Sequence, residues 1–138
     1  MTQGARLSSV VIFVHDLDPS VAFYRDVLGL EVADHSTTAA LLHNAAGTQL
    51  VLRAMGPGVG RALGAVGVQY VVWTVAGKDD LDRCERALRD RGAYRETRSD
   101  EGVTVVEGRD PDDLRVVLDY PGPDQAPLHK LPAQIYGW

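Results

Sequence analysis

The stretch SSVVIFVHDLDPSVAFYRDVLGLEV, residues 8–32, predicts a strand followed directly by a helix. Its first half is a run of β-branched and aromatic residues, which favours a strand over residues 7–14. Asp18 is a suitable N-cap residue, Pro19 suits the first helical position, and Gly29 is a natural helix stop. Between Pro19 and Gly29 the apolar side chains recur at three- and four-residue spacing, which is typical of an amphipathic helix.

The second half of the chain repeats this order of elements. The repeated strand and helix are VQYVVWTV (68–75) and KDDLDRCERALRDRG (78–92). The matching strands end at Val14 and Val75, which are 61 residues apart, and the matching helices end at Gly29 and Gly92, which are 63 residues apart. An internal repeat with so constant a period indicates two copies of one structural unit.

Weaker strand patterns follow each of the two helices. They cover residues 30–34, 39–43, 48–53, 93–97, 102–108 and 114–120. We therefore expect an α+β fold of two βαβββ modules, in which curved mixed sheets enclose a cavity and carry the helices on their outer faces. In this interpretation residues 1–138 form a single domain, made of a first module (7–53), a Gly-rich connecting loop (54–67), a second module (68–120) and a Pro-rich tail (121–138).

The composition excludes several classes of partner. The formal net charge is −5 and the chain has no long basic run, so we expect neither nucleic acid nor an anionic membrane surface as a partner. The apolar run in residues 10–14 is too short for a signal peptide or a membrane span. Cys84 is the one cysteine of the chain, so no internal disulfide can form. A cytoplasmic protein is the expectation that follows.

Three segments resemble a known superfamily. They are residues 8–32, GVQYVVWTV (67–75) and GRDPDDLRVVLDY (108–120). The chain resembles the vicinal oxygen chelate superfamily, which groups glyoxalase I, bleomycin-resistance proteins and extradiol dioxygenases. It looks closest to the small proteins that are labelled catechol-dioxygenase-like. The resemblance spans about residues 7–120, implies the two-module fold, and implies a homodimer.

Enzymes of this superfamily usually hold a divalent metal between His and Glu ligands of the inner strands. Carried over by resemblance, these ligand positions fall on Ser9, Val51, Tyr70 and Val117. Such side chains cannot replace imidazole and carboxylate donors at a transition metal. The resemblance therefore leads us to expect no metal and no other cofactor in this chain.

Strand alternation predicts which side chains line the inner face. If Ser9 points inward, every second residue along each strand does so too. The predicted ligand-binding residues are Ser9, Val11, Phe13, Gln49, Val51, Arg53, Tyr70, Val72, Thr74, Arg115, Val117 and Asp119. The set is mainly apolar with a few hydrogen-bonding groups, which is typical of a small-molecule pocket.

The favoured function is a metal-free small-molecule-binding protein of the glyoxalase/bleomycin-resistance type. It would sequester a hydrophobic or aromatic ligand, for example an antibiotic. One alternative is a metal-independent isomerase, cyclase or lyase of secondary metabolism, in which Tyr70, Asp119 and Arg115 are the candidate catalytic residues. Another is a metal-dependent dioxygenase or lyase of the same superfamily, with its ligands at other positions. Whether the chain is an enzyme stays open at this point.

Overall fold

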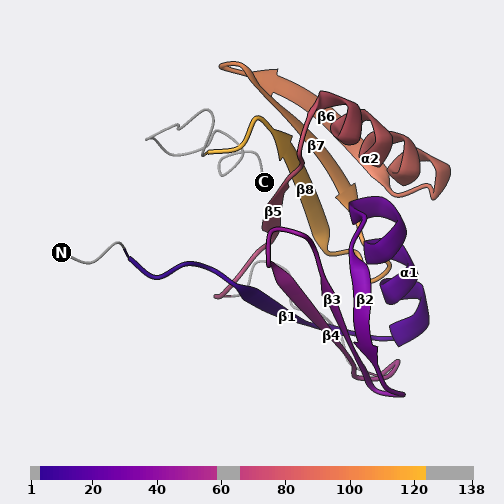
Figure 1. The fold of residues 1–138 in the computed structure, drawn as a ribbon. Coiled ribbons are helices and arrows are strands. Elements are labelled where there is room, and N and C mark those ends of the chain that lie inside the picture. The colour runs from indigo at the N-terminus through magenta and orange to yellow at the C-terminus, as the bar shows by residue number, and fades with distance from the viewer. Residues whose placement is uncertain (1–3, 59–65, 124–138) are drawn as a thin grey trace. The chain divides into compact units, whose positions relative to one another are not determined.

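The computed structural model (Figure 1) describes residues 4–58 and 66–123 of the chain. In this part of the chain the elements are β1 (Ser9–Val14), α1 (Leu17–Leu28), β2 (Glu31–His35), β3 (Ala39–His43), β4 (Gln49–Ala54), β5 (Val71–Thr74), α2 (Lys78–Asp90), β6 (Tyr94–Asp100), β7 (Val103–Arg109) and β8 (Arg115–Tyr120). The order βαβββ occurs twice, as the repeat predicts. Part of the predicted Gly-rich loop (59–65) and most of the predicted Pro-rich tail (124–138) lie outside the described residues.

Each module forms its own four-stranded mixed sheet. The strand order is β1-β4-β3-β2 in the first sheet and β5-β8-β7-β6 in the second. In both sheets the first pair is parallel and the other two pairs are antiparallel. These sheets confirm the α+β class and the two βαβββ modules. Neither sheet closes on itself, and the enclosed cavity stays a prediction.

The described chain divides into two compact units. The first contains the residues up to Gln69 together with Asp110–Leu114, and the second contains Tyr70–Arg109 and the residues from Arg115 onward. Within its own unit, each helix lies along one face of its sheet (Figure 1). Neither α1 nor α2 is long and apolar enough to cross a membrane.

The first core lies between α1 and one face of its sheet. Phe23, Tyr24 and Val27 of α1 are almost fully buried, at 2%, 1% and 0% exposure. The sheet meets them with alternate residues of β3 and β4, namely Ala40, Leu42, Leu50 and Leu52. The period of two along these strands is what places every other residue on the helix-covered face.

The helix boundaries differ slightly from the prediction. α1 begins at Leu17, with Asp16 and not Asp18 in the N-cap position. Leu17 is 5% exposed, so burial of its side chain explains the earlier start. Asp18 instead lies in the first turn, where the helix dipole favours a negative charge. Gly29 has φ 71° and ends α1 in the left-handed conformation, as predicted.

The second core follows the same plan. Leu81, Cys84 and Leu88 of α2 are buried against Val106, Val116 and Leu118 of the sheet. Gly108 of β7 allows the close approach of α2. A Cβ atom at Gly108 would lie 2.7 Å from Leu88 Cδ2 and 2.8 Å from the carbonyl oxygen of Ala93.

A buried Tyr–Asp pair fixes the turn Asp110–Leu114 within the first unit. The hydroxyl of Tyr24 donates to Asp110 Oδ2 at 2.7 Å. The backbone N–H groups of Asp112 and Leu114 both donate to Asp110 Oδ1 at 2.9 Å. The pKa of the Asp110 carboxyl is raised, mainly by burial. The pKa of the Tyr24 hydroxyl is raised as well, first by burial and then by the negative charge of Asp110. Nδ1 of His15 pairs with Asp112 at 2.7 Å and further anchors this turn.

Candidate functional site

The first sheet has one face covered by α1 and one open face. The residues of β4 alternate between buried Leu50 and Leu52 and the more accessible residues between them. On β1 the most exposed apolar side chains are Val11 (60%) and Phe13 (58%). Large apolar side chains exposed side by side are a mark of a binding surface rather than of ordinary solvent contact.

The strand register orders the open face of the first sheet into three rows across β1, β4 and β3. The rows are Ser9–Gln49–His43, Val11–Val51–Leu41 and Phe13–Arg53–Ala39. All six residues that the sequence predicts for this sheet therefore lie together on one face. His43 and Leu41 were not predicted as site residues, although the alternation of residues 39–43 would have placed them there.

The first and third of these rows carry the polar groups. The hydroxyl of Ser9 donates to Gln49 Oε1 at 3.3 Å. His43 extends the same row toward the sheet edge, where its Nε2 lies 3.9 Å from Glu31 Oε2. In the third row the guanidinium carbon of Arg53 lies 5.9 Å from the centre of the Phe13 ring, a cation–π contact.

The face of the second sheet that α2 does not cover is organised around a largely buried ion pair. Nη2 of Arg115 donates to Glu107 Oε1 at 2.7 Å, and the two side chains are only 15% and 9% exposed. The guanidinium of Arg115 also stacks on the Tyr70 ring at 4.2 Å. The hydrogen bond from Arg115 to Glu107 is the largest cause that raises the pKa of Arg115. Arg109 adds a second guanidinium 3.7 Å from Glu107 Oε2.

Glu107 was missed by the sequence prediction. The sequence does contain a signal for it, because Val103, Val105 and Glu107 are every second residue of β7 and therefore share one face. Glu107 pairs with Val117 of β8. Val103, Val105 and Val117 form a buried cluster against which Tyr70 packs. A buried carboxylate beside this cluster needs a cationic partner, and Arg115 supplies it.

Tyr70 lies just before β5 and not within a strand that begins at residue 68. The ladder between β5 and β8 starts at Val71, which is opposite Val116. In this register Tyr70 stands opposite Arg115, the first residue of β8, and residues 68 and 69 would stand opposite residues that precede β8. The side chain of Tyr70 still reaches the open face, as its contacts with Arg115 and the valine cluster show.

The three candidate catalytic residues do not form one cluster. Tyr70 and Arg115 are in contact, whereas Asp119 accepts a hydrogen bond from the hydroxyl of Thr74 at 2.6 Å. Arg115 and Asp119 are four residues apart on one strand, which corresponds to roughly 13 Å. Val72, with 49% exposure, lies between Tyr70 and Thr74 in sequence.

The donor set implied by the resemblance does not fit a divalent metal. Ser9 and Tyr70 offer hydroxyl groups, the latter against a guanidinium, while Val51 and Val117 offer no donor atom. Within residues 4–58 and 66–123, no group of three or more His, Cys, Asp or Glu side chains is placed to hold a metal ion. The open face of the first sheet instead offers apolar contact and hydrogen bonds.

Comparisons with known proteins agree with this architecture. Residues 6–118 match the family model described as Glyoxalase/Bleomycin resistance protein/Dioxygenase superfamily. No curated protein matches the sequence. A domain of the glyoxylase/bleomycin resistance protein/dioxygenase type from Frankia sp. EAN1pec is 22% identical, with a TM-score of 0.71 over 85% of this chain and 98% of that chain.

Two further solved structures show the same fold with different printed names. A lactoylglutathione lyase from Agrobacterium tumefaciens is 20% identical, with a TM-score of 0.65 over 86% of this chain and 95% of its own. The fosfomycin resistance protein FosX from Mesorhizobium loti is 14% identical, with a TM-score of 0.67 over 91% of this chain and 98% of its own. At these identities the structures establish the fold and leave the reaction open.

Proposed function

Because the chain belongs to the glyoxalase/bleomycin resistance protein/dioxygenase superfamily, we propose that it binds a small aromatic or hydrophobic molecule without a metal. The observation that carries the proposal is the open face of the first sheet, where Val11 and Phe13 are 60% and 58% exposed. The positions at which the resemblance places metal ligands in this sheet are Ser9 and Val51, which stand in neighbouring rows of this face. A ligand on this face would be bound through contact with the Phe13 ring and through hydrogen bonds.

The exposed apolar side chains supply part of the affinity that the proposed interaction needs. Covering the exposed parts of Phe13 and Val11 would contribute roughly 2–4 kcal/mol. A micromolar dissociation constant corresponds to about 8 kcal/mol, so the remaining affinity has to come from neighbouring groups. Gln49 and Arg53 lie beside these two residues and offer such contacts.

An antibiotic is a reasonable member of this ligand class. One structure of the same fold is named as a fosfomycin resistance protein. Sequestration needs affinity but no turnover, which suits a face without metal ligands. The homodimer and the cytoplasmic location stay predictions, and sedimentation of the purified chain tests the first of them.

A calorimetric screen of the chelator-treated protein against aromatic natural products tests this function. A ligand with micromolar affinity that is lost in Phe13→Ser supports the proposal. Leu7→Ser is the matched control, because Leu7 is 75% exposed and precedes β1. Binding no tighter than millimolar across a broad panel, or stoichiometric metal in protein purified without chelator, counts against it.

A metal-independent enzyme is the second candidate, and the contact between Tyr70 and Arg115 favours it. A phenol beside a buried guanidinium is suited to donating a proton to an oxygen on which negative charge develops. Tyr70→Phe separates the two functions once a ligand is known. Turnover that disappears in this variant while binding persists would favour the enzyme over sequestration.

A further inference from the structure

The rows on the open face of the first sheet are chemically different and regularly spaced. Neighbouring rows are two residues apart on each strand, which corresponds to about 7 Å, so the first and third rows are separated by roughly 13 Å. The first row offers neutral hydrogen-bonding groups from Ser9 and Gln49. The middle row is aliphatic, and the third row combines the Phe13 ring with the Arg53 guanidinium.

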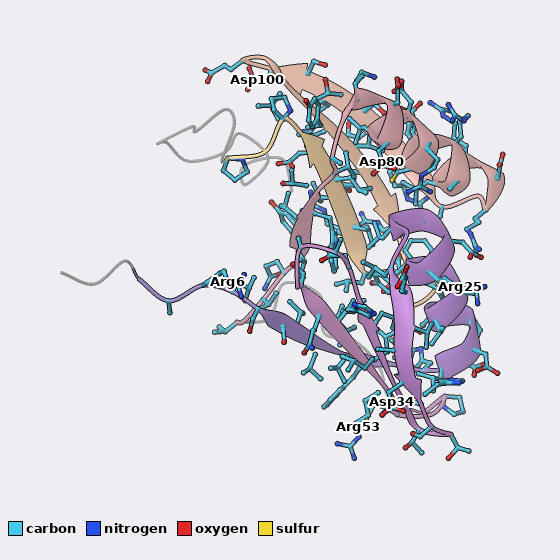
Figure 2. All side chains as sticks on the ribbon, viewed as in Figure 1. Arg6, Arg25, Asp34, Arg53, Asp80 and Asp100 are labelled. Carbon is cyan, nitrogen blue, oxygen red and sulfur yellow. The ribbon has the colours of Figure 1, made fainter. Side chains whose placement is uncertain are left out.

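Positive charge on this face lies in the third row. Arg53 is exposed, and its side chain makes no ion pair with any residue in the described part of the chain. Figure 2 shows Arg53 extending from β4 on the side of the sheet opposite α1. The carboxylate of Glu31 lies instead near His43, in line with the first row.

We propose that the ligand of this face is a flat aromatic molecule, about 10–13 Å long, that carries a carboxylate- or sulfonate-like anion at one end. The aromatic body lies over Val11, Val51 and Phe13, and the anion pairs with Arg53. Neutral hydrogen-bonding groups at the other end meet Ser9 and Gln49. This inference rests on the proposed binding function and adds the chemical class of the ligand.

The overall charge makes this a discriminating inference. The chain carries a net charge of −5, so its general field repels anions. A preference for an anionic ligand therefore has to arise from a local cation. Arg53, held beside an aromatic ring, is that cation on this face.

Two dyes with the same ring system test the inference. 1-Anilinonaphthalene-8-sulfonate is an anion, and N-phenyl-1-naphthylamine is the same molecule without the sulfonate. We expect the wild-type protein to bind the sulfonate about three- to tenfold more tightly, as befits one accessible charge pair. Arg53→Gln removes this difference, because it lowers the affinity for the sulfonate dye more than the affinity for the neutral dye.

A matched arginine on the other side of the sheet serves as control. Arg25 lies on α1, where it pairs with Asp26 (Figure 2). Arg25→Gln should keep the sulfonate preference of the wild-type protein. Circular dichroism melts of both variants establish that dye affinity is compared between folded proteins.

The possible outcomes separate the two proposals. If the neutral dye binds and the sulfonate gives no advantage, or the advantage persists in Arg53→Gln, the ligand class is wrong while the binding function stands. If neither dye binds and no ligand of the calorimetric screen loses affinity in Phe13→Ser, the binding function itself fails. If sedimentation shows a dimer whose formation excludes both dyes, a second copy and not a small molecule occupies this face, and the inference is overturned.

Discussion

Replacing Tyr24 by Phe should weaken the fold in a manner that depends on pH. The Tyr24 hydroxyl donates to a carboxylate of Asp110 that is only 5% exposed, at 2.7 Å. Removing a donor from a buried charged acceptor costs about 1.5–3 kcal/mol. With roughly 4 °C per kcal/mol for a domain of this length, the melting temperature should fall by about 6–12 °C at pH 7.

The pH dependence follows from the pKa of Asp110. Burial raises the pKa of this carboxyl above its ordinary value, and the hydrogen bond from Tyr24 lowers it. A raised carboxyl pKa means that the stability contribution of the group is fully present below the unfolded pKa of about 3.9, and is lost as the pH rises through the folded pKa. Without the hydroxyl the folded pKa rises further, so the variant loses more stability toward neutral pH.

Thermal melts at pH 4 and pH 7 measure this difference directly. We expect the loss in Tyr24→Phe to be smaller at pH 4 than at pH 7, because the raised pKa of Asp110 increases its protonated fraction at low pH and a neutral acid accepts a weaker hydrogen bond. Tyr94→Phe is the control, because the Tyr94 hydroxyl bonds to Thr97 at 2.8 Å in an exposed position. An equal loss at both pH values, or a loss no larger than that of the control, would refute the reasoning.

Three other perturbations test the packing of the second sheet and the prediction that the chain binds no metal. Arg115→Ala should lower the free energy of unfolding by about 3–5 kcal/mol, because it leaves the buried Glu107 without its main cationic partner. The double variant Glu107→Leu/Arg115→Met should lose less stability, because the buried ion pair is replaced by apolar side chains. A double variant that is less stable than Arg115→Ala would contradict this. Gly108→Ala should cost roughly 1–3 kcal/mol in denaturant unfolding, since its Cβ would lie 2.7 Å from Leu88 Cδ2. Gly58→Ala, with open space around the added Cβ, serves as control. Treatment with a chelator should change neither the melting temperature nor dye affinity, and elemental analysis should find only substoichiometric metal.

Local signals in the sequence were sufficient for the repeat and the helix ends. Gly29 and Gly92 adopt positive φ values of 71° and 67°, as their positions after the helical patterns predict. The start of α1 was predicted less well, because Asp16 and Asp18 are both capable N-cap residues. Burial of Leu17 decides between them, and that burial depends on packing that no local pattern contains.

The candidate site was predictable to the extent that strand alternation determines it. The prediction assumes that Ser9 points inward and counts every second residue from it. This places Val11, Phe13, Gln49, Val51 and Arg53 on one face of the sheet, and the structure has them together on its open face. The length of β5 depended on its pairing with β8, which is a non-local property, and so Tyr70 was assigned to a strand that begins after it. Glu107 was missed because a glutamate in a strand is usually a solvated residue. The alternation of Val103, Val105 and Glu107 places it on the face of the buried valines, and the contact with Arg115, eight residues later, shows what compensates its charge there.

The two sheets share one topology but differ in what their open faces leave available. On the second sheet, Glu107 engages Arg115, Arg115 stacks on Tyr70, and Thr74 engages Asp119, so many of the polar groups bind one another. On the first sheet, Phe13 and Val11 are more than half exposed, and the Arg53 beside them makes no ion pair in the described part of the chain. A ligand that binds the second face has to compete with an ion pair and hydrogen bonds, whereas on the first face it meets the single hydrogen bond between Ser9 and Gln49 and the contact between Arg53 and Phe13. Exposed apolar area and a local cation thus favour the first module as the part that selects the ligand, and the second as the part whose polar groups are committed to the fold.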